Sequence, residues 1–278
     1  MRRLLRNKAS MVGGLLIVLM TLTCIAGPWL SAYAYDEQNL ARQFESPSAE
    51  HWFGTDAKGR DLLVRCLHGG RVSLAVGVIA TAVSLVVGVL YGTVSGYVGG
   101  KTDEFLMRVV DVLYALPYIV MVILLVLYLG RNIYNLFLAL GLVQWLTLAR
   151  ITRGQVLHVK GQEFIDGARA MGASGRRIML LHIIPNILGP VIVYATLTVP
   201  QVMLNEAFLS FLGLGVQAPM ASWGSLAAEG AANINPLRVY WWLVVFPGGL
   251  LALTLFAMNF FGDGLRDALD PRSRERVF

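Results

Sequence analysis

The sequence predicts an all-α membrane protein with six membrane-spanning helices, and three observations lead to this fold class. First, 56% of the 278 residues are hydrophobic and only 14% are charged, whereas about a quarter of the residues in a typical soluble domain are charged. Second, long stretches of the chain lack any Asp, Glu, Lys or Arg. Third, the Lys and Arg residues are concentrated in alternate connections between those stretches. The net charge of +6 therefore reflects membrane topology and not nucleic-acid binding.

The charge-free stretches are the candidate spans. A helix needs about 20 apolar residues to cross about 30 Å of hydrocarbon. The stretches that approach or exceed this length are residues 9–35, 72–100, 112–130, 132–149, 178–205, 207–228 and 239–262. Only Arg131 separates the third from the fourth, which predicts a tight connection between them.

The stretch 207–228 is not counted as a span. It contains Gly213, Gly215 and Pro219, which disfavour a helix. Irregular backbone at membrane depth has to be covered by protein or has to line a water-filled cavity. We therefore interpret this stretch as a re-entrant or interfacial segment, with Trp223 at the level of the lipid headgroups.

The distribution of positive charge agrees with six spans that start from a cytoplasmic N-terminus. In that topology 16 of the 23 Lys and Arg residues lie inside. They are four before residue 9, two between 101 and 108, six between 150 and 177, and four after 265. A seventh span would move Arg266, Arg272, Arg274 and Arg276 outside, against the positive-inside tendency. Both termini are thus predicted to be cytoplasmic.

The first stretch resembles a signal peptide in part, because four basic residues precede it and Ala32-Tyr33-Ala34 resembles a cleavage site. The apolar run from Met11 to about Tyr33 is nevertheless long enough to span, and it exceeds the 7 to 15 residues typical of a signal h-region. We interpret it as a retained first helix.

The sequence offers no grouping that would support catalysis, a cofactor or a metal. The stretch from Ser95 to Thr102 differs from a phosphate-binding loop because Ser95 stands where that motif requires glycine. The four histidines are scattered, and Cys24 and Cys66 have no metal-ligand spacing. We predict a non-catalytic membrane subunit without catalytic, cofactor-binding or metal-binding residues.

Few ionisable residues fall within the predicted spans. Asp111 opens the third span, and Arg108 lies three residues earlier, where it can pair with Asp111 on one helix face. Glu206 ends the fifth span, and it either lines a cavity or reaches water at the helix end. Pro200 and Glu206 are the candidate pathway residues. The scarcity of buried charge disfavours ion-coupled transport, so energy for uphill transport would come from a partner.

The longest predicted cytoplasmic connection, between the fourth and fifth spans, contains a short amphipathic helix. Phe164, Ile165, Ala168 and Met171 follow one another at spacings of three and four and form one predicted apolar stripe. Gly172 then provides a C-terminal cap. Such a helix can lie against the bilayer or fit a groove on another protein.

The same connection resembles a known motif. Asp166-Gly167-Ala168, Gly172 and Ile183-Ile184-Pro185 resemble the E-A-A…G…I-x-L-P loop of ATP-binding-cassette importer permeases. In that family the loop forms a coupling helix seated in the cytoplasmic ATPase subunit. The match is imperfect: Asp166 replaces Glu, Gly167 replaces Ala, His182 stands at the Ile position and Ile184 replaces Leu. Within the loop 160–185, the resemblance implies that the ATPase-coupling residues are Glu163, Asp166, Gly167, Ala168, Gly172 and Pro185.

Other stretches are similar to the oligopeptide, dipeptide, nickel and glutathione branch of these permeases. They are Phe53-Gly54-Thr55-Asp56 with Gly59-Arg60-Asp61-Leu62, Ser210 to Gly215 with Ser222-Trp223-Gly224, and Gly262 to Pro271. In detail they resemble the oligopeptide C-type subunits. The resemblance implies the type I importer permease fold. We expect an N-terminal helix with a periplasmic segment over residues 1–70 and a permease core over 71–278, with the coupling loop at about 150–185.

The resemblance also implies a function and partners. The chain would be a permease subunit of an ATP-driven importer that moves oligopeptides across a bacterial inner membrane by alternating access. Its partners would be a second homologous permease subunit, two cytoplasmic ATP-binding subunits, an extracytoplasmic peptide-binding protein and the lipid bilayer. Permeases for dipeptide, nickel or glutathione remain alternatives, as do an ion-coupled secondary carrier and a scaffold that only recruits an ATPase.

Overall fold

The computed structural model describes residues 7–234 and 238–269. Within these ranges the chain is helical, with connecting turns and loops, and has no β-strand. Some residues used in the sequence argument lie outside the described ranges. They are Arg2, Arg3, Arg6, Asp270, Pro271, Arg272, Arg274 and Arg276.

The described helices follow the order of the predicted spans. They are α1 (Lys8–Leu30), α2 (Leu62–Val98), α3 (Gly100–Tyr114), α4 (Tyr118–Leu129), α5 (Ile133–Lys160), α6 (Glu163–Ala170), α7 (Gly175–Ile178), α8 (Ile184–Phe211), α9 (Trp223–Ala232) and α10 (Trp242–Leu269). A 3₁₀ turn, η2, covers Leu40–Arg42, and a π-helical turn, η3, covers Met179–Ile183. The expected boundary between residues 70 and 71 falls inside α2, so the two expected parts share that helix.

Among the described residues, five helical runs are long and apolar enough to cross a membrane. They are α1, α2, α5, α10 and the continuous run Gly175–Phe211. The predicted third span, 112–130, is not one helix, because α3 and α4 meet at a bend of 90°. Pro117 stands at this bend and disfavours helical backbone in the residue before it. The 12 residues of α4 cover only about 18 Å, so the sixth predicted crossing exists if α3 and α4 together count as one span.

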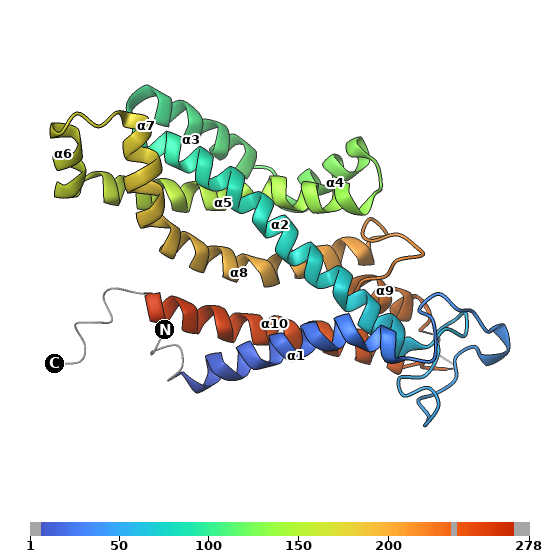
Figure 1. The fold of residues 1–278 in the computed structure, drawn as a ribbon. Coiled ribbons are helices and arrows are strands. Elements are labelled where there is room, and N and C mark those ends of the chain that lie inside the picture. Colours follow the sequence, from blue (N-terminus) through green and yellow to red (C-terminus); the bar gives the residue numbers. More distant parts are fainter. Residues whose placement is uncertain (1–6, 235–237, 270–278) are drawn as a thin grey trace.

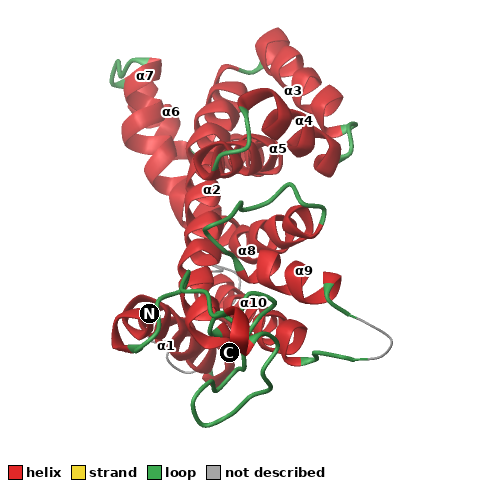
Figure 2. Ribbon diagram, turned by 90° about the vertical axis from the view of Figure 1, so that its right-hand side faces the viewer, coloured by secondary structure: helices red, strands yellow, loops and turns green. Residues whose placement is uncertain are grey.

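The helices are arranged along one long axis (Figure 1). Figure 2 shows α8 and α9 between the group of α3, α4 and α5 and the pair of α1 and α10, while α2 contacts members of each layer. At one end of the axis α6 and α7 project, and α1 begins and α10 ends at this same end of the axis, on the other side of the molecule. The segment 31–61 lies at the opposite end.

The tightest helix pair is α2 with α5, which cross at glycines spaced by four residues. A methyl group on Gly88 would lie 2.7 Å from Cβ of Leu148, and one on Gly92 would overlap the carbonyl oxygen of Ala149. Gly96 continues the row against Val156. Small residues at this spacing let two helix backbones approach closely, and side chains of α5 such as Leu148 and Val156 pack directly against the backbone of α2.

The segment 207–228 does not form a spanning helix, as the sequence predicts. α8 ends at Phe211 and the ten-residue helix α9 begins at Trp223. Trp223 itself is buried: its indole N–H donates to the Cys66 carbonyl at 2.8 Å, and its backbone N–H donates to the Ser73 hydroxyl at 3.0 Å. The Trp223 indole therefore does not face lipid, because α9 packs against α2 inside the bundle, and its position at the headgroup level stays a prediction.

Candidate coupling site and the buried polar clusters

The short helix α6 follows α5 after a two-residue turn and ends in a well-defined cap. Gly172 has a φ of +82°, in the left-handed region that glycine adopts without strain. The N–H of Gly172 donates to the Arg169 carbonyl at 2.9 Å, and the N–H of Ala173 donates to the Ala168 carbonyl at 3.1 Å. These two bonds form a Schellman motif, which satisfies the last carbonyls of a helix. The predicted cap at Gly172 is confirmed.

The predicted apolar stripe of α6 divides between two environments. Ile165 and Ala168 are buried in a cluster with apolar side chains of α2, α5, α7 and α8. Phe164 and Met171 are 48% and 84% exposed. The bundle therefore covers only one edge of the predicted stripe. Ile165 and Ala168 anchor α6, while Phe164 and Met171 point away from the protein.

The exposed side of α6 carries both signs of charge. We call it the outward face of α6, and it consists of Glu163, Phe164, Asp166, Gly167, Arg169, Ala170 and Met171. Arg169 donates from Nη1 to Oδ1 of Asp166 at 2.8 Å, in an ion pair whose side chains are 42% and 69% exposed. A methyl group on Gly167 would meet open space. The structure thus gathers Glu163, Asp166 and Gly167 on one accessible surface, with Ala168 beneath it.

Pro185 lies elsewhere, near the start of α8. In a regular α-helix its nitrogen would donate to the Leu181 carbonyl, but proline has no N–H and its ring crowds that carbonyl. The chain instead widens into η3, where the N–H of Ile184 donates to the Met179 carbonyl. Pro185 therefore shapes the connection from α7 to α8 and does not belong to the outward face of α6.

Polar contacts fix the end of the bundle from which α6 projects. Lys160, the last residue of α5, donates to the Tyr97 carbonyl near the end of α2 at 2.6 Å. Arg153 of α5 makes two hydrogen bonds of 2.6 Å with Asp103 of α3. The hydroxyl of Ser95 on α2 also donates to Asp103. The ends of α2, α3 and α5 are joined to one another directly before the turn into α6.

Asp111 is paired, but not with the predicted partner. Arg150 of α5 donates to Asp111 at 2.7 Å, while Arg108 pairs with Glu104 at 3.4 Å. The Arg150 guanidinium also lies 4.1 Å from the centroid of the Tyr114 ring. The predicted pair within α3 is wrong because Asp111 contacts α5, where the Tyr114 ring also holds Arg150 in place.

Glu206 is buried within α8, five residues before the helix ends. Its Oε1 accepts hydrogen bonds from the hydroxyls of Ser210 at 2.6 Å and Ser222 at 2.7 Å. Ser222 is the N-cap of α9, so Glu206 links α8 to the start of α9. The interpretation of Glu206 as a helix-end residue that reaches water is wrong, since its side chain is 1% exposed.

A cavity of about 740 Å³ lies next to this link, between α4, α8, α9 and α10. Its lining consists of Ile119, Leu204, Asn205, Ala207, Phe208, Phe211, Gly224, Ala227 and Leu251. Pro200 and Glu206 are buried and are not part of the lining. Their assignment to the transport pathway stays a prediction.

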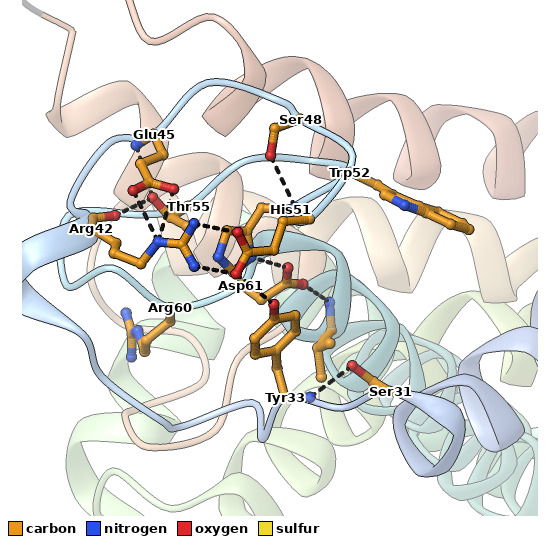
Figure 3. A network of polar contacts seen from close by, with 12 residues as sticks. Ser31, Tyr33, Arg42, Glu45, Ser48, His51, Trp52, Thr55, Arg60 and Asp61 are labelled. Carbon is orange, nitrogen blue, oxygen red and sulfur yellow. Dashed lines mark hydrogen bonds and ion pairs between the residues drawn. The ribbon is translucent and has the colours of Figure 1, made fainter.

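At the opposite end of the molecule a polar network holds the segment 31–61 together (Figure 3). Arg42 donates to both oxygens of Glu50, at 2.5 and 2.7 Å. These hydrogen bonds lower the pKa of Glu50 to about 2. Nearby, Nδ1 of His51 lies 2.8 Å from Oδ2 of Asp61, and Asp61 caps the start of α2.

A second charged cluster was not predicted from the sequence. Oδ2 of Asp56 accepts hydrogen bonds from Arg60 at 2.7 Å and Arg65 at 2.6 Å, and Arg65 also donates to Glu229 of α9 at 2.7 Å. Asp56 and Arg60 belong to a stretch that resembles importer permeases, and the structure forms a turn there. No local pattern could reveal Glu229, because 164 residues separate it from Arg65.

Comparison with known proteins identifies the family. The sequence model of a family described as "Binding-protein-dependent transport system inner membrane component" matches residues 74–275. The chain belongs to this family. A second family model, described as the N-terminal TM domain of oligopeptide transport permease C, matches residues 1–47. As a binding-protein-dependent transport component with several apolar helices, the protein is a multi-pass membrane protein.

Curated relatives in this transport family align over almost the whole chain. The oligopeptide transport system permease protein OppC of Escherichia coli strain K12 is 51% identical, over 98% of this chain and 90% of that protein. OppC of Haemophilus influenzae is 49% identical, over 98% of this chain and 88% of that protein. The dipeptide transport system permease protein DppC of Bacillus subtilis strain 168 is 45% identical, over 98% and 85%.

A solved structure shares the fold of this binding-protein-dependent transport component. A chain of the MetNI methionine ABC transporter, in an inward-facing conformation, matches with a TM-score of 0.60 and 19% identity. The match covers 75% of this chain and 98% of that chain. The predicted all-α importer permease fold is confirmed.

Proposed function

We propose that this protein is the transmembrane permease subunit of an ATP-driven oligopeptide importer, and that α6 is the helix that couples it to a cytoplasmic ATP-binding subunit. The division of α6 into two faces carries this proposal. Ile165 and Ala168 fix the helix to its own bundle, while the outward face of α6 leaves apolar and charged side chains free for a partner. A helix with both faces buried in its own protein would have no accessible surface for a partner to bind.

The connections of α6 support a mechanical role. Lys160 ends α5 only three residues before Glu163 begins α6, and the contacts of Lys160 and Arg153 join α5 to α2 and α3. Closure of an ATPase dimer on α6 would therefore tilt several helices together. In this mechanism the ATPase stabilises one of two states of the bundle, which is alternating access driven by differential binding. ATP hydrolysis belongs to the partner subunits, and this chain is non-catalytic.

The partners follow from this arrangement. If α6 meets a cytoplasmic ATPase, then the end of the bundle with α6, the start of α1 and the end of α10 is cytoplasmic, in a bacterial inner membrane. The segment 31–61 then faces outward, toward an extracytoplasmic peptide-binding protein. A second homologous permease subunit and a second ATP-binding subunit would complete the pathway. Glu206 and Pro200 would act on that pathway from within α8.

Oligopeptides are the substrate class best supported by the relatives. Three OppC proteins are 46% to 51% identical to this chain, and a DppC protein at 45% supports dipeptides as the alternative. The cavity beside α8 has the amide of Asn205 in its lining but no carboxylate, imidazole or thiol that would hold nickel. Uptake of labelled tripeptides to pentapeptides by the complete importer, competed by dipeptides, glutathione or Ni²⁺, separates these substrates. Competition by Ni²⁺ alone would contradict the peptide assignment.

The coupling role is tested by reversing one charge on the outward face of α6. Asp166→Lys breaks an exposed ion pair worth less than about 1 kcal/mol, so the protein should still fold and reach the membrane. We expect peptide uptake to fall at least about tenfold, because two or more ATPase contacts of about 1 kcal/mol would be lost or made repulsive. ATP hydrolysis by the assembled complex should no longer depend on the binding protein.

Glu104→Lys is the matched control. Glu104 forms the same kind of exposed pair, with Arg108 on α3, and both side chains are 72% exposed. Uptake should stay near the unmodified level in this variant. Equal uptake in the Asp166 and Glu104 variants would contradict the coupling assignment of α6, whatever the substrate is.

A further inference from the structure

Arg71 of α2 is held in place by backbone carbonyls of α1. Pro28 has no N–H, so it leaves the carbonyl of Cys24, four residues earlier, without its helical hydrogen bond. Nε of Arg71 donates to this carbonyl at 2.7 Å, and Nη2 donates to the carbonyl of Ile25. The guanidinium is thus positioned by neutral groups.

The positive charge of Arg71 is not neutralised by the described part of the chain. None of the ion pairs formed among residues 7–234 and 238–269 includes Arg71. Cys24 lies six residues before the end of α1, about 9 Å along the helix. An unpaired charge near the hydrocarbon region is costly unless it reaches an anionic partner. Trp29, 84% exposed on the same stretch of α1, is a residue type enriched at membrane interfaces.

A groove of about 290 Å³ opens beside the guanidinium, between α1 and α2. Its lining consists of Thr21, Cys24, Ile25, Trp29, Arg71 and Leu74. The groove therefore combines one cation with an otherwise largely apolar wall. Arginine has five N–H donors, and the two carbonyls occupy two of them, so three remain for a ligand.

We propose that this groove binds an anionic phospholipid of the bilayer. The phosphate accepts hydrogen bonds from the free donors of Arg71, in the charge-assisted geometry that guanidinium and phosphate favour. The first part of an acyl chain lies between α1 and α2 against Thr21 and Leu74. The net negative charge of the lipid supplies the counter-charge that the protein does not provide. The bound lipid fastens α1 to α2 near the end of the bundle that carries the segment 31–61.

Lipid counting on the purified full-length protein tests this site. The protein in detergent is titrated with phosphatidylglycerol and, separately, with phosphatidylcholine, and bound lipid is counted by native mass spectrometry. We expect phosphatidylglycerol to bind about tenfold more tightly than phosphatidylcholine, and Arg71→Gln to remove this preference. Arg131→Gln is the matched control, because Arg131 is an exposed arginine in the connection between α4 and α5. It should bind both lipids like the unmodified protein.

A second variant separates the lipid from the contacts between α1 and α2. Thr21→Trp fills the groove but leaves the donors of Arg71 on the α1 carbonyls, and it should also weaken phosphatidylglycerol binding about tenfold. Equal affinity for the two lipids, or unchanged binding in both the Arg71 and Thr21 variants, would overturn the proposal. So would an Arg71 variant that keeps its lipid but loses a copurifying protein chain, since the groove would then be a subunit interface.

Discussion

Two glycines of the coupling site serve opposite conformational purposes. Gly167 lies inside α6, where glycine weakens a helix by about 1 kcal/mol relative to alanine. Gly172 caps the same helix with a positive φ, where any other residue is strained. A methyl group at either position would meet open space. The two positions therefore differ in backbone conformation alone.

This difference predicts opposite effects of the same substitution. Gly172→Ala should destabilise the end of α6 by about 1 to 2 kcal/mol, and Gly167→Ala should stabilise the helix by about 0.5 to 1 kcal/mol. Amide hydrogen exchange across residues 163–172 measures both, with exchange faster in the first variant and slower in the second. Effects of the same sign would show that the cap does not control the helix.

At the scale of single residues, the sequence predicts what depends on local backbone. Gly172 was found because a glycine after an apolar helical pattern is a typical cap, and the Schellman bonds are made by neighbouring residues. Ser222, one of the two partners of Glu206, was not predicted, because it lies 16 residues away across an irregular loop. Arg150 was likewise missed as the partner of Asp111, 39 residues away.

At the scale of the element, the role of α6 depends on which edge of its apolar stripe packs against the bundle. At 100° per residue, Phe164, Ile165, Ala168 and Met171 span about 120° of the helix surface. The pattern therefore predicts an amphipathic helix correctly, but it does not tell which edge packs against the bundle. The structure buries the edge with Ile165 and Ala168 and exposes the edge with Phe164 and Met171.

The two edges should respond differently to truncation. Ile165→Ala leaves a cavity in a buried cluster and should cost about 2 to 5 kcal/mol locally, which detaches α6 from the bundle. Phe164→Ala removes an exposed side chain and should change the unfolding free energy by less than about 0.5 kcal/mol. Both should reduce peptide uptake, but only the Ile165 variant should lower the thermal unfolding midpoint. A large stability loss in the Phe164 variant would contradict the exposed edge.

The spans themselves could be predicted where absence of charge coincides with continuous helix. The prediction of the third span as one helix was wrong because the search for charge-free stretches ignores Pro117. The effect of this proline on the residue before it is nevertheless a local signal in the sequence. The sequence also places the end of the fourth span at 149, whereas α5 continues to Lys160. Charged residues such as Arg150 and Arg153 do not end a helix when cross-helix partners hold them.

At the scale of the whole molecule, α2 is the longest helix and contacts α1, α5, α8 and α9. Its glycine row against α5 sets how close these two helices come. The sequence shows the four-residue spacing of Gly88, Gly92 and Gly96, but spacing alone does not identify the facing helix. Only the packing reveals that Leu148, Ala149 and Val156 fill the other side.

This packing predicts that one added methyl group has different effects on α2 and on α5. Gly92→Ala would overlap the Ala149 carbonyl and lie 2.7 Å from Cβ of Thr152, so it should destabilise the bundle by about 1 to 3 kcal/mol. Gly154→Ala on α5 meets open space and should be neutral or stabilise by up to about 1 kcal/mol. Thermal unfolding in detergent compares the two. Equal midpoints would contradict the close contact.

The close contact between α2 and α5 has a further consequence for how a displacement passes through the molecule. Where Gly88, Gly92 and Gly96 face α5, α2 contributes no side chain that could change rotamer to absorb a displacement, so we expect the two helices to move together. The helix α2 has 37 residues and is about 55 Å long. We therefore expect a displacement where α5 turns into α6 to reach the far end of α2 as well, where Asp61 begins the helix and Arg65 contacts α9.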